Sequence, residues 1–287
     1  DTGFCKPLLK AFVPEDVNAR VFTVEGCEGQ RLRWRLLPVM GAADSASVQF
    51  SFDGRSVRIT NPESYYDGAV LTLTCSMPMQ CSFDYEDNSV ILSLVADKKT
   101  VLVCGIDSEE RLSALCGEEA CGAAEEKVRG AWQALLSRLS LSCGLEPLDS
   151  YMGGWCLYQI IACRLRGRAS LYQSGGAIGF RDQLQDAVNL ILFDFAYARE
   201  RIIDCCKHQY TQGDVMHWWH VHPDGDMGIR TRCSDDLLWL CWAVCEYCEK
   251  TGDYAICGQT APYIDSPALK DGEGDRYEKA VPCAQAS

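Results

Sequence analysis

The chain has 287 residues, of which 47% are hydrophobic, enough for one large domain or two ordinary ones. Lys and Arg number 27 against 40 Asp and Glu, giving a net charge of −13 that would repel a phosphate backbone and excludes nucleic acid as an expected partner. The longest apolar stretch, at 237–244, is too short for the roughly 20 residues that cross a bilayer, and no basic start precedes an apolar signal core, so we expect a cytoplasmic protein without a membrane segment.

Apolar and polar residues alternate with period two through the first hundred residues. The alternation predicts antiparallel strands at 31–36, 48–52 and 89–95. Asp53-Gly54, directly after the second of these, is a tight-hairpin signature. The spacing of the strands predicts a β-sandwich, or part of one, over residues 1–107.

From about residue 108 the period changes to that of a helix. An amphipathic helix is predicted in a linker over 108–146, with an apolar face formed by Val128, Trp132, Leu135, Leu136 and Leu139. The pattern then predicts helices at about 149–166, 182–198, 199–209 and 235–251, and no further strands. Residues 155–165 are apolar nearly all round, which is typical of a helix inside a helical assembly. Residues 147–287 are therefore predicted to begin a helical barrel or toroid.

Eighteen cysteines are spread along a chain far too long for a disulfide-stapled miniprotein, so most are predicted to be buried free thiols. Cys241, Cys245 and Cys248 have a spacing that holds an iron–sulfur cluster when an irregular loop carries it. Residues 237–250 contain no Gly or Pro and carry apolar residues at helical spacing. The three thiols are therefore predicted to lie along one helix face as small core residues.

All four histidines fall within fifteen residues, at His208, His217, His220 and His222. Such density is typical of zinc sites. The segment is flanked by Gly213 and by turn residues at 223–226, and the paired Trp218 and Trp219 equally suit a sugar-binding wall carried by a loop. The sequence favours the sugar wall and predicts no metal ligands, while zinc stays the alternative.

A polar grouping at 173–186 begins with Gln173 and contains three glycines, which let a backbone approach a ligand closely. Arg181 then opens a helix on which Asp182, Gln185, Asp186 and Asn189 share one face. A polar stripe is usually a solvated surface. The apolar run at 190–193 indicates instead a helix buried on several sides, whose polar stripe lines a cavity for a polyhydroxylated ligand.

A second polar grouping covers 230–239. Ser234 is a predicted N-cap, and the helix dipole favours Asp235 and Asp236 in a first turn, which would explain both carboxylates without a function. The pair also follows the histidine–tryptophan segment closely. A carboxylate here would meet an aromatic pocket of the kind that glycoside chemistry uses.

These groupings resemble glycoside hydrolase family 94. The resemblance is carried by 172–186 with its Gly-Phe-Arg-Asp-Gln-Leu-Gln-Asp run, by 213–220 with His-Trp-Trp-His, and by 230–240 with Ser-Asp-Asp-Leu-Leu-Trp-Leu. The family contains cellobiose, chitobiose and β-1,2-oligoglucan phosphorylases and the C-terminal region of cyclic β-1,2-glucan synthases. The motif sequences of this chain are more similar to those of the β-1,2-glucan members. The resemblance implies a β-sandwich, a linker helix and the first part of an (α/α)6 barrel at 147–287. It also implies that the chain is a piece of a longer protein, as its start at Asp1 without Met suggests.

The resemblance implies roles for individual residues. Asp235 matches the general acid of the family, with Asp236 as the weaker alternative, and Arg181, Asp182 and Asp186 match residues that hold the glucosyl unit. Further substrate contacts are expected from Gln173, Trp218, Trp219, His220 and Arg232. A charge-offsetting contact to phosphate is expected from Arg181, Arg230 or Arg232.

The implied activity is inverting phosphorolysis of β-1,2-linked glucooligosaccharides to α-glucose 1-phosphate in the full-length parent, with this piece alone inactive. Such an enzyme needs one acid and no protein base, because phosphate is the nucleophile. A helix N-terminus lowers the pKa of a carboxylate, so burial beside aromatics would have to raise the pKa of Asp235 by more. The expected partners are an oligosaccharide and inorganic phosphate, with no cofactor and with no membrane within this fragment, and a homodimer of the full-length protein stays open.

Three other interpretations stay open. One is a non-catalytic carbohydrate-binding fragment. Another is the glucan-processing region of a cyclic β-1,2-glucan synthase. A hydrolase of similar barrel fold is the third, and it would need a second carboxylate base that the sequence does not reveal.

Overall fold

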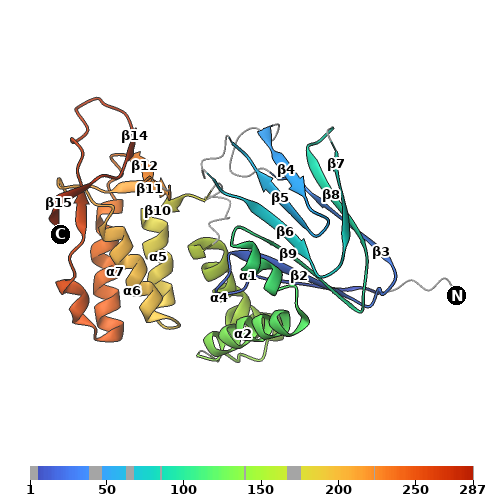
Figure 1. The fold of residues 1–287 in the computed structure, drawn as a ribbon. Coiled ribbons are helices and arrows are strands. Elements are labelled where there is room, and N and C mark those ends of the chain that lie inside the picture. Colours follow the sequence, from blue (N-terminus) through green and yellow to red (C-terminus); the bar gives the residue numbers. More distant parts are fainter. Residues whose placement is uncertain are drawn as a thin grey trace. The chain divides into compact units, whose positions relative to one another are not determined.

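The structure, a computed structural model, describes residues 6–38, 47–62, 68–84, 86–138, 140–166, 176–222 and 224–286. The chain divides into two compact units, Asp1–Gln133 and Ala134–Ser287 (Figure 1). The division falls within helix α2 (Glu118–Leu136), and the predicted domain bounds at 107 and 146 stay predictions. Leu139, Gln173 together with the rest of 172–175, and residue 223 of the predicted turn lie outside the described residues.

The first unit is built from antiparallel strands. They are β1 (Leu8–Phe12), β2 (Ala19–Glu25), β3 (Arg31–Leu36), β4 (Gln49–Phe52), β5 (Ser56–Thr60), β6 (Leu71–Cys75), β7 (Met79–Asp84), β8 (Ser89–Val95) and β9 (Lys99–Gly105). A six-stranded sheet has the order β1-β2-β9-β6-β5-β4, and a three-stranded sheet has the order β3-β8-β7. The predicted antiparallel strands are thus confirmed. So is the hairpin, because Asp53 Oδ1 accepts the N–H of Arg55 and of Ser56 between β4 and β5.

Both sheets contribute to one hydrophobic core in the first unit. Val57 and Leu73 come from the larger sheet, and Val90 and Leu92 come from the smaller one. A further cluster contains Leu112, which lies on helix α1 (Glu109–Ala114), together with residues of β2 and β9. The period-two pattern corresponds to alternating burial in β3, whereas β8 is buried over most of its length and β4 is exposed throughout. The β-sandwich of the family stays a prediction.

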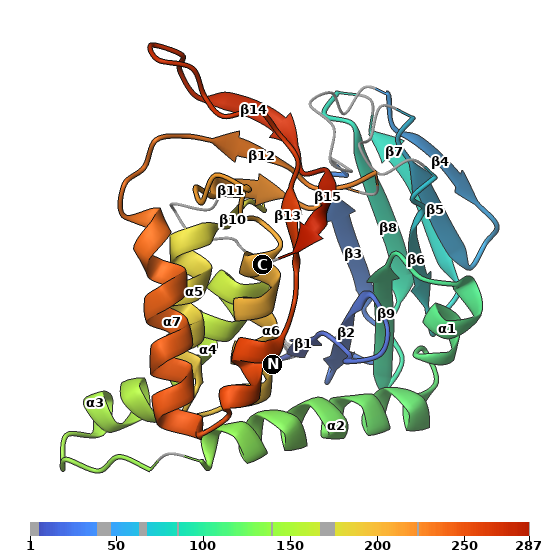
Figure 2. The ribbon, with the colours of Figure 1, turned by 90° about the vertical axis from the view of Figure 1, so that its left-hand side faces the viewer.

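The second unit combines helices with short strands (Figures 1 and 2). Its helical segments are α3 (Glu146–Ser150), η2 (Tyr151–Trp155), α4 (Cys156–Tyr158), η3 (Gln159–Arg166), α5 (Phe180–Leu190), α6 (Phe195–Cys206), α7 (Asp236–Thr251) and η4 (Tyr254–Gly258). Its strands are β10 (Ile178–Gly179), β11 (Met216–His220), β12 (Met227–Arg230), β13 (Pro262–Ile264), β14 (Arg276–Lys279) and β15 (Pro282–Ala286). Four strands form one antiparallel sheet in the order β10-β11-β12-β14, and β13 pairs with β15.

Helices α5, α6 and α7 pack against one another beside the four-stranded sheet (Figure 2). Each supplies a fully buried side chain to a common core, namely Leu184, Ile202 and Tyr247, and β11 adds Trp219. None of the helices among the described residues is long and apolar enough to cross a membrane. Antiparallel sheets with several helices are the observed architecture, and the (α/α)6 barrel stays a prediction.

Three predictions about the elements of the second unit are wrong. Strands do return after residue 147, and the histidine–tryptophan segment that was expected to be a loop forms β11. The expected helices at 182–198 and 199–209 are instead α5 and α6, separated by residues 191–194. The second of them begins where it does because the Asp194 side chain accepts the N–H of Tyr197 at 3.1 Å and caps the new helix.

Two predictions about burial are also wrong. The three cysteines of the 241–248 run do lie on one helix, α7, yet only Cys248 is buried and Cys241 and Cys245 are exposed. The inward face of α7 is filled by larger side chains such as Tyr247. In the helical segment at 146–166, Trp155 and Tyr158 are exposed and stack on each other rather than packing in a core.

Candidate active site

The second unit brings Arg181 and Asp235 together from two sequence motifs. Arg181 lies in the first turn of α5, and Asp235 is the N-cap residue of α7. Arg181 Nη1 donates to Asp235 Oδ2 at 2.8 Å. Because α5 packs against α7, the N-terminal ends of the two helices present these side chains to each other. This pair joins the predicted general acid to a predicted glucosyl-binding residue.

Three donors surround the Asp235 carboxylate. Besides Arg181, Cys233 Sγ lies 3.0 Å from Oδ1, and the indole N–H of Trp239 donates to Oδ2 at 3.3 Å. The hydrogen bond from Cys233, followed by those from Arg181 and Trp239, lowers the pKa of Asp235 well below its usual range. Asp235 is half-exposed rather than buried. The expectation that burial beside aromatics raises the pKa of Asp235 is therefore wrong.

Asp236 lies in a different environment from its neighbour. Its side chain is buried, and His217 Nδ1 lies 2.6 Å from Asp236 Oδ2. This hydrogen bond raises the pKa of His217 above its ordinary value. The pair ties β11 to the start of α7. Ser234, which was expected to cap this helix, does not, since the cap position is that of Asp235.

The two predicted sugar-binding carboxylates of α5 share one arginine. Arg164 Nε donates to Asp186 Oδ2 at 2.7 Å, and Arg164 Nη2 lies 3.8 Å from Asp182 Oδ1. Burial raises the pKa of Asp186 to about 6 despite this partner. Gln183 donates to the carbonyl oxygen of Arg164 at 3.2 Å, which fixes the helical segment η3 against α5. Sequence reasoning missed Arg164, although an arginine within an apolar helical pattern is a signal for a buried partner.

Gly179 makes room for one of these carboxylates. A Cβ at this position would lie 2.5 Å from Asp182 Oδ2. The glycine therefore lets the Asp182 side chain fold back over the start of α5.

The predicted aromatic wall is divided between two faces of β11. Trp218 and His220 lie on one face, with their rings edge to face at 5.4 Å, and Tyr277 of β14 lies 5.9 Å from Trp218. Trp219 points into the core, is fully buried, and stacks on His208 at 3.7 Å. The expected substrate contact by Trp219 is thus wrong, because alternate residues of a strand point to opposite faces.

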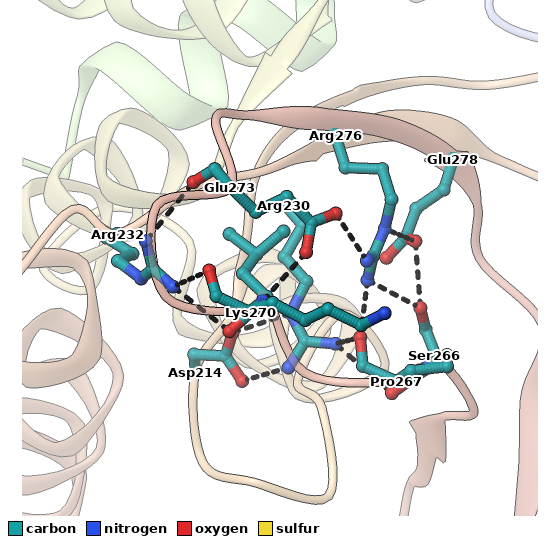
Figure 3. Close-up of polar contacts among 10 residues, drawn as sticks. Asp214, Arg230, Arg232, Ser266, Pro267, Lys270, Glu273, Arg276 and Glu278 are labelled. Carbon is teal, nitrogen blue, oxygen red and sulfur yellow. Dashed lines mark hydrogen bonds and ion pairs between the residues drawn. The ribbon is translucent and has the colours of Figure 1, made fainter.

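Arg230 is a structural residue. Its guanidinium is fully buried and binds Asp214 in a two-pronged ion pair, with both distances at 2.7 Å. The remaining N–H groups donate to Gln212 Oε1 and to the carbonyl oxygens of Ser266 and Pro267, as Figure 3 shows for the latter two. The ring of Tyr210 covers the group at 3.8 Å. All five donors are therefore used, and Arg230 has none left for phosphate.

The side chain of Arg232 contacts backbone carbonyl groups rather than the predicted site. Its guanidinium donates to the carbonyl oxygens of Leu269, Lys270 and Glu273 (Figure 3). It holds the turn that leads to β14. The expected substrate contact by Arg232 is therefore not formed in this arrangement, since its donors are engaged by backbone.

Among the described residues, the histidines do not converge on a common centre. His208 stacks on Trp219, His220 lies against Trp218, and His222 accepts the N–H of Asp224. His208 Nε2 also lies 3.0 Å from Asp226 Oδ2. Among the described residues, the histidine that belongs to a group of three metal-binding side chains is His217, because its ring nitrogen, Cys233 Sγ and an Asp236 oxygen all lie within 4.8 Å of one another. Sequence reasoning did not connect these three residues.

Residues 131–284, more than half of the chain, match the catalytic domain of the glycosyl hydrolase 94 superfamily. The chain belongs to this superfamily. The match covers the segments that supply Arg181, His217 and Asp235, so the ion pair described above lies within the catalytic domain of the family.

Glycosyl hydrolase 94 relatives include enzymes of two kinds. Over 231 residues, 79% of this chain, the sequence is 32% identical to the cyclic β-(1,2)-glucan synthase NdvB of Rhizobium meliloti (strain 1021). It is 29% identical over 182 residues, 54% of the chain, to the N,N'-diacetylchitobiose phosphorylase of Vibrio proteolyticus, and 29% identical over 140 residues, 47% of the chain, to the solabiose phosphorylase of Paenibacillus borealis. The chain spans only 8%, 22% and 16% of these relatives.

Proposed function

We propose that this chain is part of a glycoside phosphorylase that cleaves β-linked glucooligosaccharides, with the β-1,2 linkage as the preferred substrate, by inverting phosphorolysis to α-glucose 1-phosphate. The observation that carries the proposal is the Arg181–Asp235 ion pair, which joins two motifs 54 positions apart at the N-terminal ends of α5 and α7. A carboxylate for proton transfer and a cation for the sugar or the phosphate are the groups that this reaction needs.

Asp235 is the proposed general acid. It donates a proton to the glycosidic oxygen while a phosphate oxygen attacks the anomeric carbon from the opposite face, so the carbon–oxygen bond to the leaving sugar breaks as the bond to phosphate forms. No protein base is required, because phosphate already carries the nucleophilic oxygen. The proposed reaction needs no metal or cofactor.

The contacts of Asp235 define what substrate binding must change. Hydrogen bonds from Cys233, Arg181 and Trp239 hold the pKa of Asp235 low, which favours the ionised form. In the proposed complex, Arg181 turns to the glucosyl unit, while the phosphate charge and the exclusion of water raise the pKa of the acid. The acid is thereby protonated only when both substrates are in place.

The glucan-processing region of a cyclic β-1,2-glucan synthase is the second candidate. The 32% identity to NdvB over 79% of this chain favours it. Both candidates use the same proposed acid on a β-glucan. Because the chain spans between 8% and 22% of the relatives, the activity is proposed for the full-length protein, and the 287 residues alone are expected to release no glucose 1-phosphate.

Separate substitution of the two adjacent aspartates by asparagine in the full-length enzyme tests the proposed acid. Asp235→Asn is expected to lower phosphorolysis of a β-1,2-glucooligosaccharide by about 10²–10⁴-fold. It should spare an aryl glucoside far more, because a phenolate leaves without protonation. The measurement is the release of glucose 1-phosphate from both substrates.

Asp236→Asn is the matched control. Its side chain is buried against His217, and adjacent helical residues point about 100° apart, so it should alter stability or binding without the dependence on the leaving group. The assignment moves to Asp236 if that variant alone shows the dependence. A full-length protein that binds the glucan but shows no turnover in the wild type would instead identify a carbohydrate-binding protein.

A further inference from the structure

Three side chains with metal-binding atoms meet beside the proposed acid. His217 comes from β11, Cys233 from the segment after β12, and Asp236 from the first turn of α7. A ring nitrogen, a sulfur and a carboxylate oxygen from these residues all lie within 4.8 Å of one another. They come from a strand, a connecting segment and a helix of the second unit.

The types of donor favour one class of cation. Imidazole nitrogen, thiolate sulfur and carboxylate oxygen together are ligands of Zn²⁺, whereas Mg²⁺ and Ca²⁺ prefer oxygen alone. In a tetrahedral zinc site, bonds of about 2.0–2.3 Å place neighbouring ligand atoms roughly 3.3–3.8 Å apart. The spacing of the three donors allows this geometry with small movements of the side chains.

The burial of Asp236 gives a second, independent indication. The residue is 1% exposed. One of its oxygens, Oδ2, faces His217 at 2.6 Å. The other, Oδ1, is buried and has no hydrogen-bond partner among the described residues. A buried carboxylate with an unused oxygen is costly in a folded protein unless a bound ion, another ligand or an ordered water satisfies it.

The geometry points to a Zn²⁺ site formed by His217, Cys233 and Asp236, with Asp235 at the fourth position. Asp235 Oδ1 already lies 3.0 Å from Cys233 Sγ, so its carboxylate reaches the same centre. Zn²⁺ displaces the thiol proton of Cys233, which goes to solvent. His217 binds as neutral imidazole through the nitrogen that carries no proton, and an imidazolium form of the ring would release its second proton to solvent as well. His217 and Cys233 are partly exposed, which gives the ion a path of entry.

Occupation of this site has a consequence that rests on the proposed function. A carboxylate bound to Zn²⁺ cannot carry the proton that the glycosidic oxygen requires. Zn²⁺ is therefore an inhibitor of the proposed phosphorolysis rather than a cofactor for it.

Titration of the 287-residue chain with Co²⁺ tests the site, because cobalt in a thiolate-containing tetrahedral site gives strong charge-transfer and visible absorption. One equivalent should develop this spectrum, and Zn²⁺ should abolish it by competition. Cys233→Ser should remove the sulfur-dependent band, and His217→Gln should weaken Co²⁺ binding by more than about tenfold. Cys241→Ser is the matched control, since it changes an exposed thiol on α7 and should leave the spectrum unchanged.

The proposal is overturned if no stoichiometric tetrahedral spectrum appears, or if the spectrum survives both Cys233→Ser and His217→Gln. Circular dichroism of each variant establishes that it is folded. Should Cys233→Ser not fold, the His217→Gln titration decides alone. A chain that binds Co²⁺ as expected, within a full-length protein that releases no glucose 1-phosphate, would retain the metal site and reject the proposed function. Phosphorolysis that stoichiometric Zn²⁺ leaves unchanged would reject the inhibition.

Discussion

Arg230 illustrates how a charged side chain is kept inside a small core. The guanidinium is 0% exposed, and each of its donors has an acceptor from Asp214, Gln212 or a carbonyl oxygen. Figure 3 shows Arg230 together with Asp214, Ser266 and Pro267. A buried cation without its counter-ion is far more costly than one that is paired. The network is therefore cooperative, and the loss of a single carboxylate should affect all of it.

We expect Asp214→Ala to reduce the free energy of unfolding of the second unit by about 3–5 kcal/mol, because the substitution leaves the Arg230 charge uncompensated. Glu246→Ala, which removes a carboxylate 2.7 Å from Lys250 on the exposed side of α7, should cost less than about 1 kcal/mol. Urea denaturation of the two variants compares them. Equal losses would contradict a structural role for Arg230.

Asp186 provides a pH-dependent test. Its pKa is raised from the ordinary 3.8 to about 6, so between these values the folded protein holds a proton that the unfolded chain has released. The associated stability is fully present below about pH 4 and is lost as the pH rises through 6. Asp186→Asn lacks this titration. The unfolding free energy of the wild type should therefore fall relative to that of the variant between about pH 4 and 7, and a constant difference would disprove the raised pKa.

The residues of the candidate site were predictable to different degrees. The motifs directed attention to Arg181 and Asp235, and the structure brings these two into contact. Trp219 and Arg232 could not be placed from sequence, because the direction of a strand side chain depends on register and the partners of Arg232 lie some forty positions away. Arg164 was missed for the same reason, since its carboxylate partners follow about twenty residues later.

At the scale of elements, long periodic segments were the predictable ones. Helix α7 was expected at 235–251 and is found at Asp236–Thr251, where its C-cap, Gly252, adopts a left-handed conformation with φ of 71°. The short strands β10 to β15 were not predicted. Segments of two to five residues carry too little periodicity to be recognised, and their pairing is decided by partners elsewhere in the chain.

Strand β12 contains a glycine that the sheet requires. A Cβ on Gly228 would lie less than 3.0 Å from the Trp218 carbonyl oxygen and from Met216 Sδ, next to the β-bulge between Met216 and Trp218. We expect Gly228→Ala to lower the unfolding free energy by about 1–3 kcal/mol through overpacking. Gly258→Ala is the control, because nothing lies within 4 Å of its Cβ position. Thermal denaturation of both variants checks the difference, and similar melting temperatures would refute the close approach.

At the scale of the whole molecule, the chain has separate cores in its two units. We expect two calorimetric transitions. Leu92→Ala in the first unit and Leu184→Ala in the second each remove a fully buried leucine and should each cost about 2–5 kcal/mol. Each substitution should lower the midpoint temperature of a different transition. If both substitutions lower the midpoint of the same transition, the units unfold together.

The order of strands in the second unit bears on how a growing chain acquires its fold. The central strand β12 pairs with β11 just before it and with β14 at Arg276–Lys279, and the carbonyl oxygens that receive Arg230 come from Ser266 and Pro267. A nascent chain that has emerged only as far as Thr251 already has the sequence of α5, α6 and α7, but it lacks both the last strand of the sheet and two acceptors for the buried guanidinium. Such long-range closure is slow compared with helix formation. During synthesis the closing of the sheet and the burial of Arg230 therefore follow the three helices. Arg230 stays hydrated until about thirty further residues have left the ribosome.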